Sequence, residues 1–98
     1  MMQKLNKTNF KETINSTELV LVKFSSNWCG PCKIVGKLLD EMQKTLPKTY
    51  EVDVDENMEL CEEYKITNIP VVMLFKSGEM LKKHVGLMSK EEIEQFVK

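Results

Sequence analysis

Apolar and polar positions alternate with different periods along the chain, and the segments with period two or continuous apolar character predict strands. Residues 19–24 are apolar and mostly β-branched except for Lys23, which is typical of a strand covered on both faces of an α/β sheet. A glycine turn at residues 76–79 indicates that the last two strands form a hairpin, which Gly86 ends. The expected strands are residues 3–5, 19–24, 49–54, 71–75 and 80–85.

Helical periodicity fills the segments between these strands. From Pro31 to Pro47 apolar residues recur at three- and four-residue spacing, which predicts the longest helix. The Asn and Glu of residues 9–12 resemble a capping box ahead of a short first helix, and the Ser and Glu of residues 89–92 indicate a second one before the last helix. The apolar stripe of the long helix consists of Ile34, Val35, Leu38, Leu39, Met42 and Leu46.

A short helix is expected after the third strand, capped by Asp55 or Asn57, with Met58, Cys61 and Tyr64 on its inner face. The order strand, helix, strand, helix, strand, helix, hairpin, helix predicts an α/β fold that forms one domain over residues 1–98. Right-handed crossovers make the first three strands parallel, and the hairpin adds antiparallel strands. The last helix is expected to pack inward through Ile93, Phe96 and Val97, with Met88 and Ile93 forming a hydrophobic staple.

Length and charge narrow the possible functions. The chain has 98 residues, enough for one hydrophobic core. All fourteen basic residues are Lys, against fifteen acidic ones, so no guanidinium fork exists for phosphate or base recognition and we expect no nucleic-acid partner. The longest uncharged apolar stretch, residues 69–75, is too short to span a bilayer, and residues 1–7 carry no apolar signal-peptide core. A cytoplasmic monomer without membrane contact is expected.

The candidate chemistry lies where the second strand ends and the long helix begins, at Cys29-Gly30-Pro31-Cys32. Two cysteines three positions apart at a helix start lie one turn apart on one face, so they can form a disulfide. Free backbone N–H groups and the helix dipole stabilise a thiolate at Cys29, which predicts the attacking nucleophile. Cys32 lies further into the helix and is expected to be the resolving thiol.

Residues 28–33, Trp-Cys-Gly-Pro-Cys-Lys, follow an apolar strand and precede a downstream Ile69-Pro70, and in this the chain resembles the thioredoxin family. Residues 52–55, 64–66, 75–78 and 85–86 also stand in the family's order and spacing, so the resemblance covers nearly the whole chain. It implies a thioredoxin fold, with a mixed five-stranded central sheet flanked by four helices, and a redox-active disulfide between Cys29 and Cys32.

The resemblance also implies a substrate-docking surface. The peptide bond before Pro70 is expected to be cis, which would leave the backbone of Ile69 free to pair with an extended substrate; the alternative is a trans proline that starts an edge strand. The polar run before Trp28 favours a place at the rim of the site over one in the core. The residues assigned to docking are Trp28, Gly30, Pro31, Ile69, Pro70 and Gly86.

At two positions the charge departs from the family pattern. Thioredoxins usually carry a buried Asp where this chain has Lys23 and a Lys where it has Glu51, so both charges are inverted. We expect the two side chains to form a buried ion pair across adjacent strands beneath Cys32, with a role in pKa tuning or proton transfer; the alternative is two unrelated surface residues. Cys61 is interpreted as structural rather than regulatory, and His84, in a charged hairpin strand, as exposed.

These residues favour a thiol–disulfide oxidoreductase that reduces protein disulfides, with peroxiredoxins or ribonucleotide reductase as examples of substrates. A separate thioredoxin reductase, a flavoprotein using NADPH, would restore the dithiol, because this chain has no Gly-x-Gly-x-x-Gly motif and is expected to bind no cofactor. One alternative is a binding subunit or scaffold that does not need the cysteines. Another, a zinc site from Cys29, Cys32, Cys61 and His84, lacks a second ligand pair at zinc spacing, so we expect no metal.

Overall fold

Strands and helices alternate through the computed structural model, which describes residues 2–98; position 1 of the expected domain and of the N-terminal segment lies outside the described residues. All nine predicted elements are present in the predicted order. The strands are β1 (Gln3–Leu5), β2 (Val20–Ser25), β3 (Lys48–Asp53), β4 (Val71–Lys76) and β5 (Glu79–Val85). The helices are α1 (Phe10–Ile14), α2 (Gly30–Glu41), α3 (Met58–Glu63) and α4 (Lys90–Phe96), with a 3-10 turn η1 (Gln43–Thr45).

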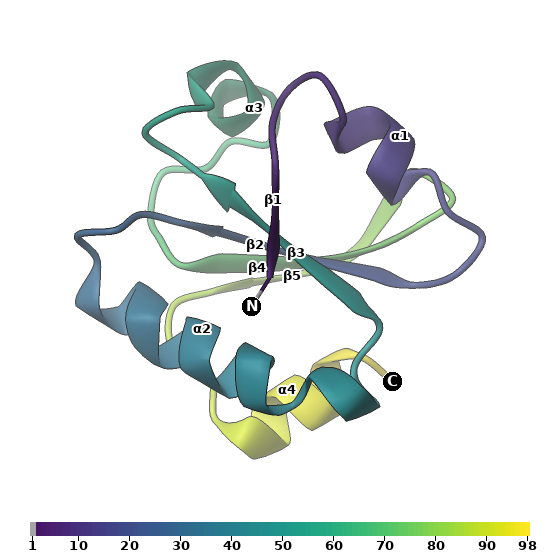
Figure 1. The fold of residues 1–98 in the computed structure, drawn as a ribbon, viewed down its shortest axis with the longest axis vertical. Coiled ribbons are helices and arrows are strands. Elements are labelled where there is room, and N and C mark those ends of the chain that lie inside the picture. Colours follow the sequence, from purple (N-terminus) through teal and green to yellow (C-terminus); the bar gives the residue numbers. More distant parts are fainter. Residues whose placement is uncertain (1) are drawn as a thin grey trace.

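The strands form one mixed sheet in the order β1-β3-β2-β4-β5. β1, β3 and β2 are parallel, whereas β4 is antiparallel to β2 and β5 is antiparallel to β4. Helices α1 and α3 cover one face of this sheet, and α2 and α4 cover the other (Figure 1). The predicted fold class is therefore confirmed, and β2, which leads into the cysteine motif, lies at the centre of the sheet with a neighbour on each side.

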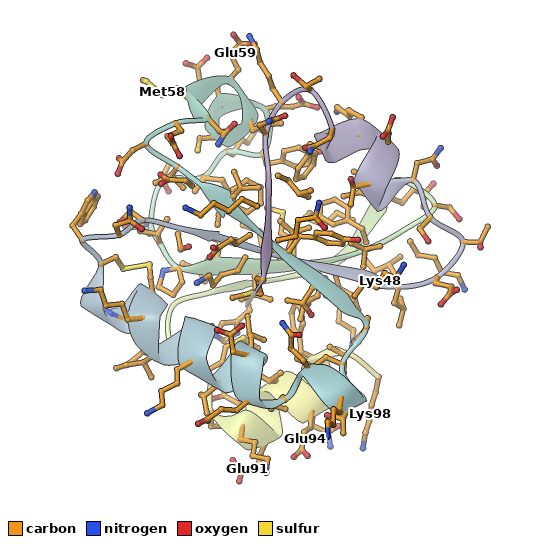
Figure 2. All side chains as sticks on the ribbon, viewed as in Figure 1. Lys48, Met58, Glu59, Glu91, Glu94 and Lys98 are labelled. Atoms are coloured by element: carbon orange, nitrogen blue, oxygen red, sulfur yellow. A yellow bond between two sulfur atoms is a disulfide. The ribbon has the colours of Figure 1, made fainter. Side chains whose placement is uncertain are left out.

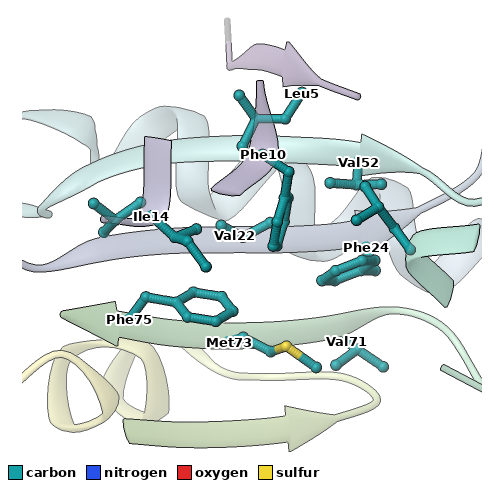
Figure 3. Close-up of a cluster of buried hydrophobic side chains, with 11 residues drawn as sticks. Leu5, Phe10, Ile14, Val22, Phe24, Val52, Val71, Met73 and Phe75 are labelled. Carbon is teal, nitrogen blue, oxygen red and sulfur yellow. The ribbon is translucent and has the colours of Figure 1, made fainter. Parts of the chain in front are cut away.

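Two hydrophobic clusters, one on each face, hold the helices to the sheet. Val22 and Phe24 point from β2 into the α1/α3 cluster, and Leu21, which precedes Val22, points into the α2/α4 cluster. Phe10 and Phe24 are fully buried in the first cluster, and burial of such a side chain contributes about 1.5–3 kcal/mol (Figure 3). The alternation along β2 thus assigns each of its residues to one helical layer, which places Lys23 on the α2/α4 side.

Helix α2 ends earlier than predicted. It stops at Glu41 with Met42 as its C-cap, and the chain then tightens into η1 before Pro47. Ile34 is 55% exposed, so it does not belong to the buried stripe, whereas Val35 and Leu39 are fully buried. The buried face of α2 is therefore narrower than the sequence indicates, and it consists of Cys32, Val35, Gly36 and Leu39.

The first capping box is absent, and the second is present. The Asn9 side chain makes no cap bond; its Oδ1 accepts from the backbone N–H of Asn6, so a local turn takes the group that would have capped α1. At α4, the Ser89 hydroxyl accepts from Glu92 N at 3.1 Å and Glu92 Oε1 accepts from Ser89 N at 2.9 Å. Met88 and Ile93, the expected staple, are both buried in the α2/α4 cluster.

The expected inner face of α3 is only partly correct: Tyr64, the C-cap residue, packs against the α1/α3 cluster, but Met58 does not face inward. Leu60 is the buried residue of this helix, Met58 is 69% exposed and Cys61 is half-buried (Figure 2). Asn57 is the N-cap residue by position, but its side chain donates to the carbonyl of Asp53 and does not cap the helix. A helix of six residues has too few apolar positions to show which of its faces is buried, so the sequence does not distinguish a face with Met58 from one with Leu60.

The candidate active site at the start of helix α2

Cys29 and Cys32 form the centre of the site, where the loop after β2 leads into α2. Cys29 is the N-cap residue of α2 with an extended backbone, and Pro31 stands in the first turn, where its missing N–H leaves no hydrogen bond unmade. The two sulfurs are joined in a disulfide, with the Cα atoms 5.2 Å apart. The backbone N–H of Cys32 donates to Cys29 Sγ at 3.2 Å, so the helix start directs a donor at the outer sulfur.

The two cysteines differ in their access to solvent. Cys29 is 7% exposed and Cys32 is 1% exposed, while Gly30 and Pro31 between them lie on the surface. An incoming disulfide can therefore reach Cys29 first, and Cys32 is shielded by the helix and the sheet. This order of exposure is the one that the sequence predicts.

Trp28 stands at the rim of the site. Its side chain is 71% exposed, and its indole Nε1–H donates to Asp55 Oδ2 at 2.8 Å. The alternative of a core position is excluded, and the hydrogen bond fixes the ring beside Cys29. The sequence does not link Asp55 to Trp28, because nothing in it pairs residues 27 positions apart.

The Ile69-Pro70 segment approaches Gly86 at the edge of β4. The Ile69-Pro70 peptide bond is cis, so the trans alternative is excluded. Pro70 is buried and Ile69 half-buried, and β4 begins only at Val71, which leaves Ile69 outside the strand ladder. Gly86 N donates to the carbonyl of Pro70 at 2.8 Å, and its φ of +97° favours glycine at this position.

Lys23 and Glu51 are register partners on the parallel strands β2 and β3. Lys23 Nζ lies 3.4 Å from Glu51 Oε2, and the Lys23 side chain is 6% exposed against 20% for Glu51. The expected ion pair is present, and the alternative of two unrelated surface residues is wrong. Gly36, one turn after Cys32 on α2, lies directly against the ammonium: a methyl group at its Cα would stand 2.7 Å from Lys23 Nζ. Nothing in the sequence indicates this contact.

Cys61 is a free, half-buried thiol whose Sγ lies 3.8 Å from the carbonyl oxygen of Val54. Burial raises the pKa of Cys61, and the nearby carboxylates of Asp55 and Asp53 raise it further. The thiol therefore stays protonated at neutral pH, which fits the interpretation of this cysteine as structural.

His84 is half-buried, so the expected exposure was wrong. Its Nε2 is hydrogen-bonded to the carbonyl of Leu87 at 2.9 Å, and its ring lies edge-on to Phe96 at 6.5 Å because β5 passes beside α4. Among residues 2–98 no group of three or more His, Cys, Asp or Glu side chains is placed to hold a metal ion. Over the same residues, no helix has the length and apolar character needed to cross a membrane.

A pair of cysteines that bridges at the first turn of a helix can take up and return two electrons by exchanging its disulfide with another. On a mixed sheet with helices on both faces, this site defines a thiol–disulfide oxidoreductase.

Comparison with known proteins agrees with this class. The thioredoxin family model matches residues 1–98. The chain is 38% identical to a thioredoxin of Mycoplasmoides gallisepticum over 95% of each chain, and 36% identical to one of Rickettsia felis over 99% of this chain and 96% of the relative. The oxidised crystal structure of mitochondrial thioredoxin 3 from Saccharomyces cerevisiae superposes with a TM-score of 0.87 at 28% identity, over 98% of this chain and 92% of the other.

The chain belongs to the thioredoxin family. It is an oxidoreductase that reduces protein disulfides through its own cysteine pair. Membership of this family implies disulfide-containing substrates and a reductase that restores the dithiol.

Proposed function

We propose that Cys29 is the nucleophile and Cys32 the resolving thiol. The Cys29 thiolate attacks one sulfur of a substrate disulfide, forms a mixed disulfide and releases the other substrate sulfur as a thiolate, which takes a proton. The Cys32 thiolate then attacks Cys29 Sγ, and the second substrate sulfur leaves. Two electrons pass to the substrate, and the chain is left with the Cys29–Cys32 disulfide. The observation that supports this order is the greater exposure of Cys29, together with the N–H that points at its sulfur.

Substrate docking is proposed for residues of the cysteine motif and of the segments around Ile69-Pro70 and Gly86. The exposed Trp28 ring offers an apolar face, and Ile69 lies outside the ladder of β4, so its peptide group can pair with an extended substrate segment. The bond between Gly86 and Pro70 holds the two loops of this surface together. The complete set is Trp28, Gly30, Pro31, Ile69, Pro70 and Gly86.

For Lys23 and Glu51 we propose a role in setting the protonation of Cys32. The Lys23 side chain is buried and its ammonium lies directly against Gly36 of α2. Gly36 follows Cys32 by one helical turn. Solvent ions screen buried charges only weakly, so the charges of this pair act on the Cys32 thiol one helical turn from Gly36.

The partners proposed are a flavoprotein thioredoxin reductase that uses NADPH, and substrates such as peroxiredoxins or ribonucleotide reductase. The sequence supports an external source of electrons, since its four glycines form no dinucleotide-binding motif. A cytoplasmic monomer is proposed as the working form, and the unpaired Cys61 thiol suits a reducing compartment.

The test is reduction of a protein disulfide such as that of insulin, first with dithiothreitol and then with NADPH and candidate reductases. We expect the parent chain to turn over and Cys29→Ser to be inactive. Cys32→Ser should accumulate a mixed disulfide with the substrate that a second thiol releases. Equal activity of Cys29→Ser and the parent would contradict the proposed mechanism.

A further inference from the structure

We propose that Lys23 is a positioning residue for the resolving step: its ammonium, held by Glu51 and accommodated by Gly36, stabilises the thiolate of Cys32. The inference rests on the proposed role of Cys32 as the resolving thiol. Of the two charges in the buried pair, the Lys23 ammonium lies nearer to α2, so the pair as a whole presents positive potential to Cys32.

The position of the ammonium follows from contacts on both sides. Lys23 lies between Val22 and Phe24, which point into the α1/α3 cluster, so its side chain projects toward α2. Lys23 Nζ is 2.7 Å from the place of a methyl group on Gly36. Gly36 and Cys32 are four residues apart on one helix face, about 5–6 Å between Cβ positions. The ammonium is therefore no more than about 9 Å from the Cβ of Cys32.

Glu51 is the outer partner of the pair. Its side chain is 20% exposed, whereas that of Lys23 is 6% exposed. The three heavy atoms nearest to a methyl group on Gly36 are Lys23 Nζ, Lys23 Cε and Met2 Cε, the last two at 3.9 Å, so no Glu51 atom lies closer than these. Water reaches the carboxylate more readily than the ammonium and screens it more, which leaves the cation with the larger effect at α2.

Gly36 is what makes room for the cation. A larger residue would occupy the place that Lys23 Nζ takes against the helix, and the ammonium would have to leave either α2 or Glu51. Glycine is otherwise unfavourable in a helix interior, and its φ is not in the left-handed region, so backbone conformation does not call for it. The close approach of Lys23 gives this glycine a structural purpose.

The sign of the effect depends on every charged group near Cys32. On α2 itself Cys29 carries no charge at the resolving step, because its sulfur is bonded to the substrate, and Lys33 is exposed and screened. From the sheet, Glu51 and the half-buried Asp53 on β3 oppose ionisation, and β4 contributes no charge before its last residue. Lys23 is the one buried cation among these groups in the described part of the chain. It is therefore the group that can favour the Cys32 thiolate at the moment when it attacks Cys29 Sγ.

The decisive variant replaces both charges by apolar groups, Lys23→Met with Glu51→Leu, because a buried pair exchanged in this way usually leaves the fold intact. The Cys32 thiol is titrated in a Cys29→Ser, Cys61→Ala background, in which no other thiol interferes. If the cation dominates, the double variant titrates about half a pH unit higher than its parent. If the carboxylate dominates, it titrates lower, and if the pair is only structural, it does not shift; either result overturns the proposal.

The dithiol–disulfide equilibrium with glutathione gives a second readout in the chain with all three cysteines. Above the pH at which Cys32 ionises, Lys23→Met should shift the equilibrium about tenfold toward the disulfide, about 30 mV. Lys37→Met, which removes an equal charge from an exposed position beside Gly36, is the matched control and should not shift it. An equal shift in both variants would contradict the proposal. Failure of the parent to reduce protein disulfides would instead contradict the proposed function, because the titration of Cys32 does not depend on turnover.

Discussion

At the scale of single residues, the reactivity of the three cysteines depends on what surrounds each sulfur. Cys29 has a helix-terminal N–H and the greater exposure of the bridged pair, while Cys32 is closed off. In the reduced chain we expect brief iodoacetamide treatment at neutral pH to label Cys29 first, measured by mass spectrometry of peptides. Labelling of Cys32 or Cys61 ahead of Cys29 would contradict the assignment of the nucleophile.

Cys61 provides the internal control for that experiment through its pH dependence. Its pKa is raised, first by burial and then by Asp55 and Asp53, so the thiolate forms only at higher pH than for a free cysteine. Labelling of Cys61 should be slow at pH 7 and should accelerate as the pH rises above about 8.5. Asp55→Asn should move this acceleration to lower pH, because it removes a negative charge that opposes the thiolate.

The Lys23–Glu51 pair predicts strong coupling in stability. Glu51→Leu leaves an uncompensated buried ammonium and should cost about 3 kcal/mol or more in the free energy of unfolding. Lys23→Met should cost less, since the Glu51 carboxylate keeps partial access to water. Denaturant unfolding of both single variants and the double variant gives the coupling, and the double variant should be more stable than the sum of the singles indicates. Additive effects would show that the two charges do not interact.

The sequence predicted the charge pair but not the residue that accommodates it. Lys23 and Glu51 were noticeable because each interrupts an apolar strand, and a buried charge requires a partner. Gly36 gave no such signal, because a glycine in a helix indicates neither its neighbours nor the space it leaves. Asp55 was missed for a similar reason: a surface carboxylate has many possible partners, and its bond to Trp28 depends on how two loops meet in the fold.

At the scale of elements, Gly36 tests how tightly α2 packs on the sheet. Alanine is favoured over glycine in a helix by about 0.5–1 kcal/mol, but here the added methyl group would stand 2.7 Å from Lys23 Nζ. We expect Gly36→Ala to lower the free energy of unfolding by about 1–3 kcal/mol, as overpacking does. Gly30→Ala, at the exposed start of the same helix with nothing within 4 Å, should not destabilise the chain. A stabilising effect of Gly36→Ala would show that the Lys23 ammonium can shift without cost and that its close contact with Gly36 does not contribute to stability.

The capping box of α4 gives a prediction with a defined pH dependence. Ser89→Ala should cost about 1 kcal/mol, because the N–H of Glu92 loses its acceptor. Hydrogen bonds from the Ser89 backbone N–H and then from its side chain lower the pKa of Glu92. A lowered pKa in the folded state stabilises the fold above the unfolded pKa of about 4.3, and this contribution disappears as the pH falls through the folded pKa. The destabilisation by Glu92→Gln, measured by thermal unfolding at pH 7, should therefore shrink at pH 3; an equal loss at both pH values would contradict it.

Strands and long helices were more predictable than short helices. β2 and β4 are nearly continuous apolar runs, which can only be buried inside the sheet, and the apolar stripe of α2 repeats through three turns. α1 and α3 contain five and six residues, so one competing contact decides their ends and their phase. At α1 the competing contact is the turn around Asn6, and at α3 it is the bond between Asn57 and the Asp53 carbonyl.

At the scale of the whole molecule, the strand order is what assembles the site. With β2 between β3 and β4, the cysteine motif, the Ile69-Pro70 segment and the Lys23–Glu51 pair come from three neighbouring strands and the loops after or before them. The continuous apolar run of residues 19–24 predicted one strand with two buried faces, but the apolar pattern could not fix the full order of the strands or their register. The family resemblance implied a mixed sheet of five strands, and the structure supplies their order and register.

The redox state of the site should alter the stability of the entire fold. A bridge that closes a four-residue loop restricts the unfolded chain by about 2 kcal/mol in the chain-entropy treatment, so the oxidised chain should unfold at a temperature about 8–16 °C above that of the reduced chain. Thermal unfolding with and without dithiothreitol measures the gap, and Cys29→Ser, which cannot form the bridge, should show none. The gap closes a thermodynamic cycle: each 1.4 kcal/mol by which the disulfide stabilises the folded chain makes the folded dithiol ten times easier to oxidise than the unfolded one. Equal unfolding temperatures in both states would mean that the disulfide does not stabilise the fold. The folded surroundings of Cys29 and Cys32 would then leave their dithiol–disulfide equilibrium the same as in an unfolded chain.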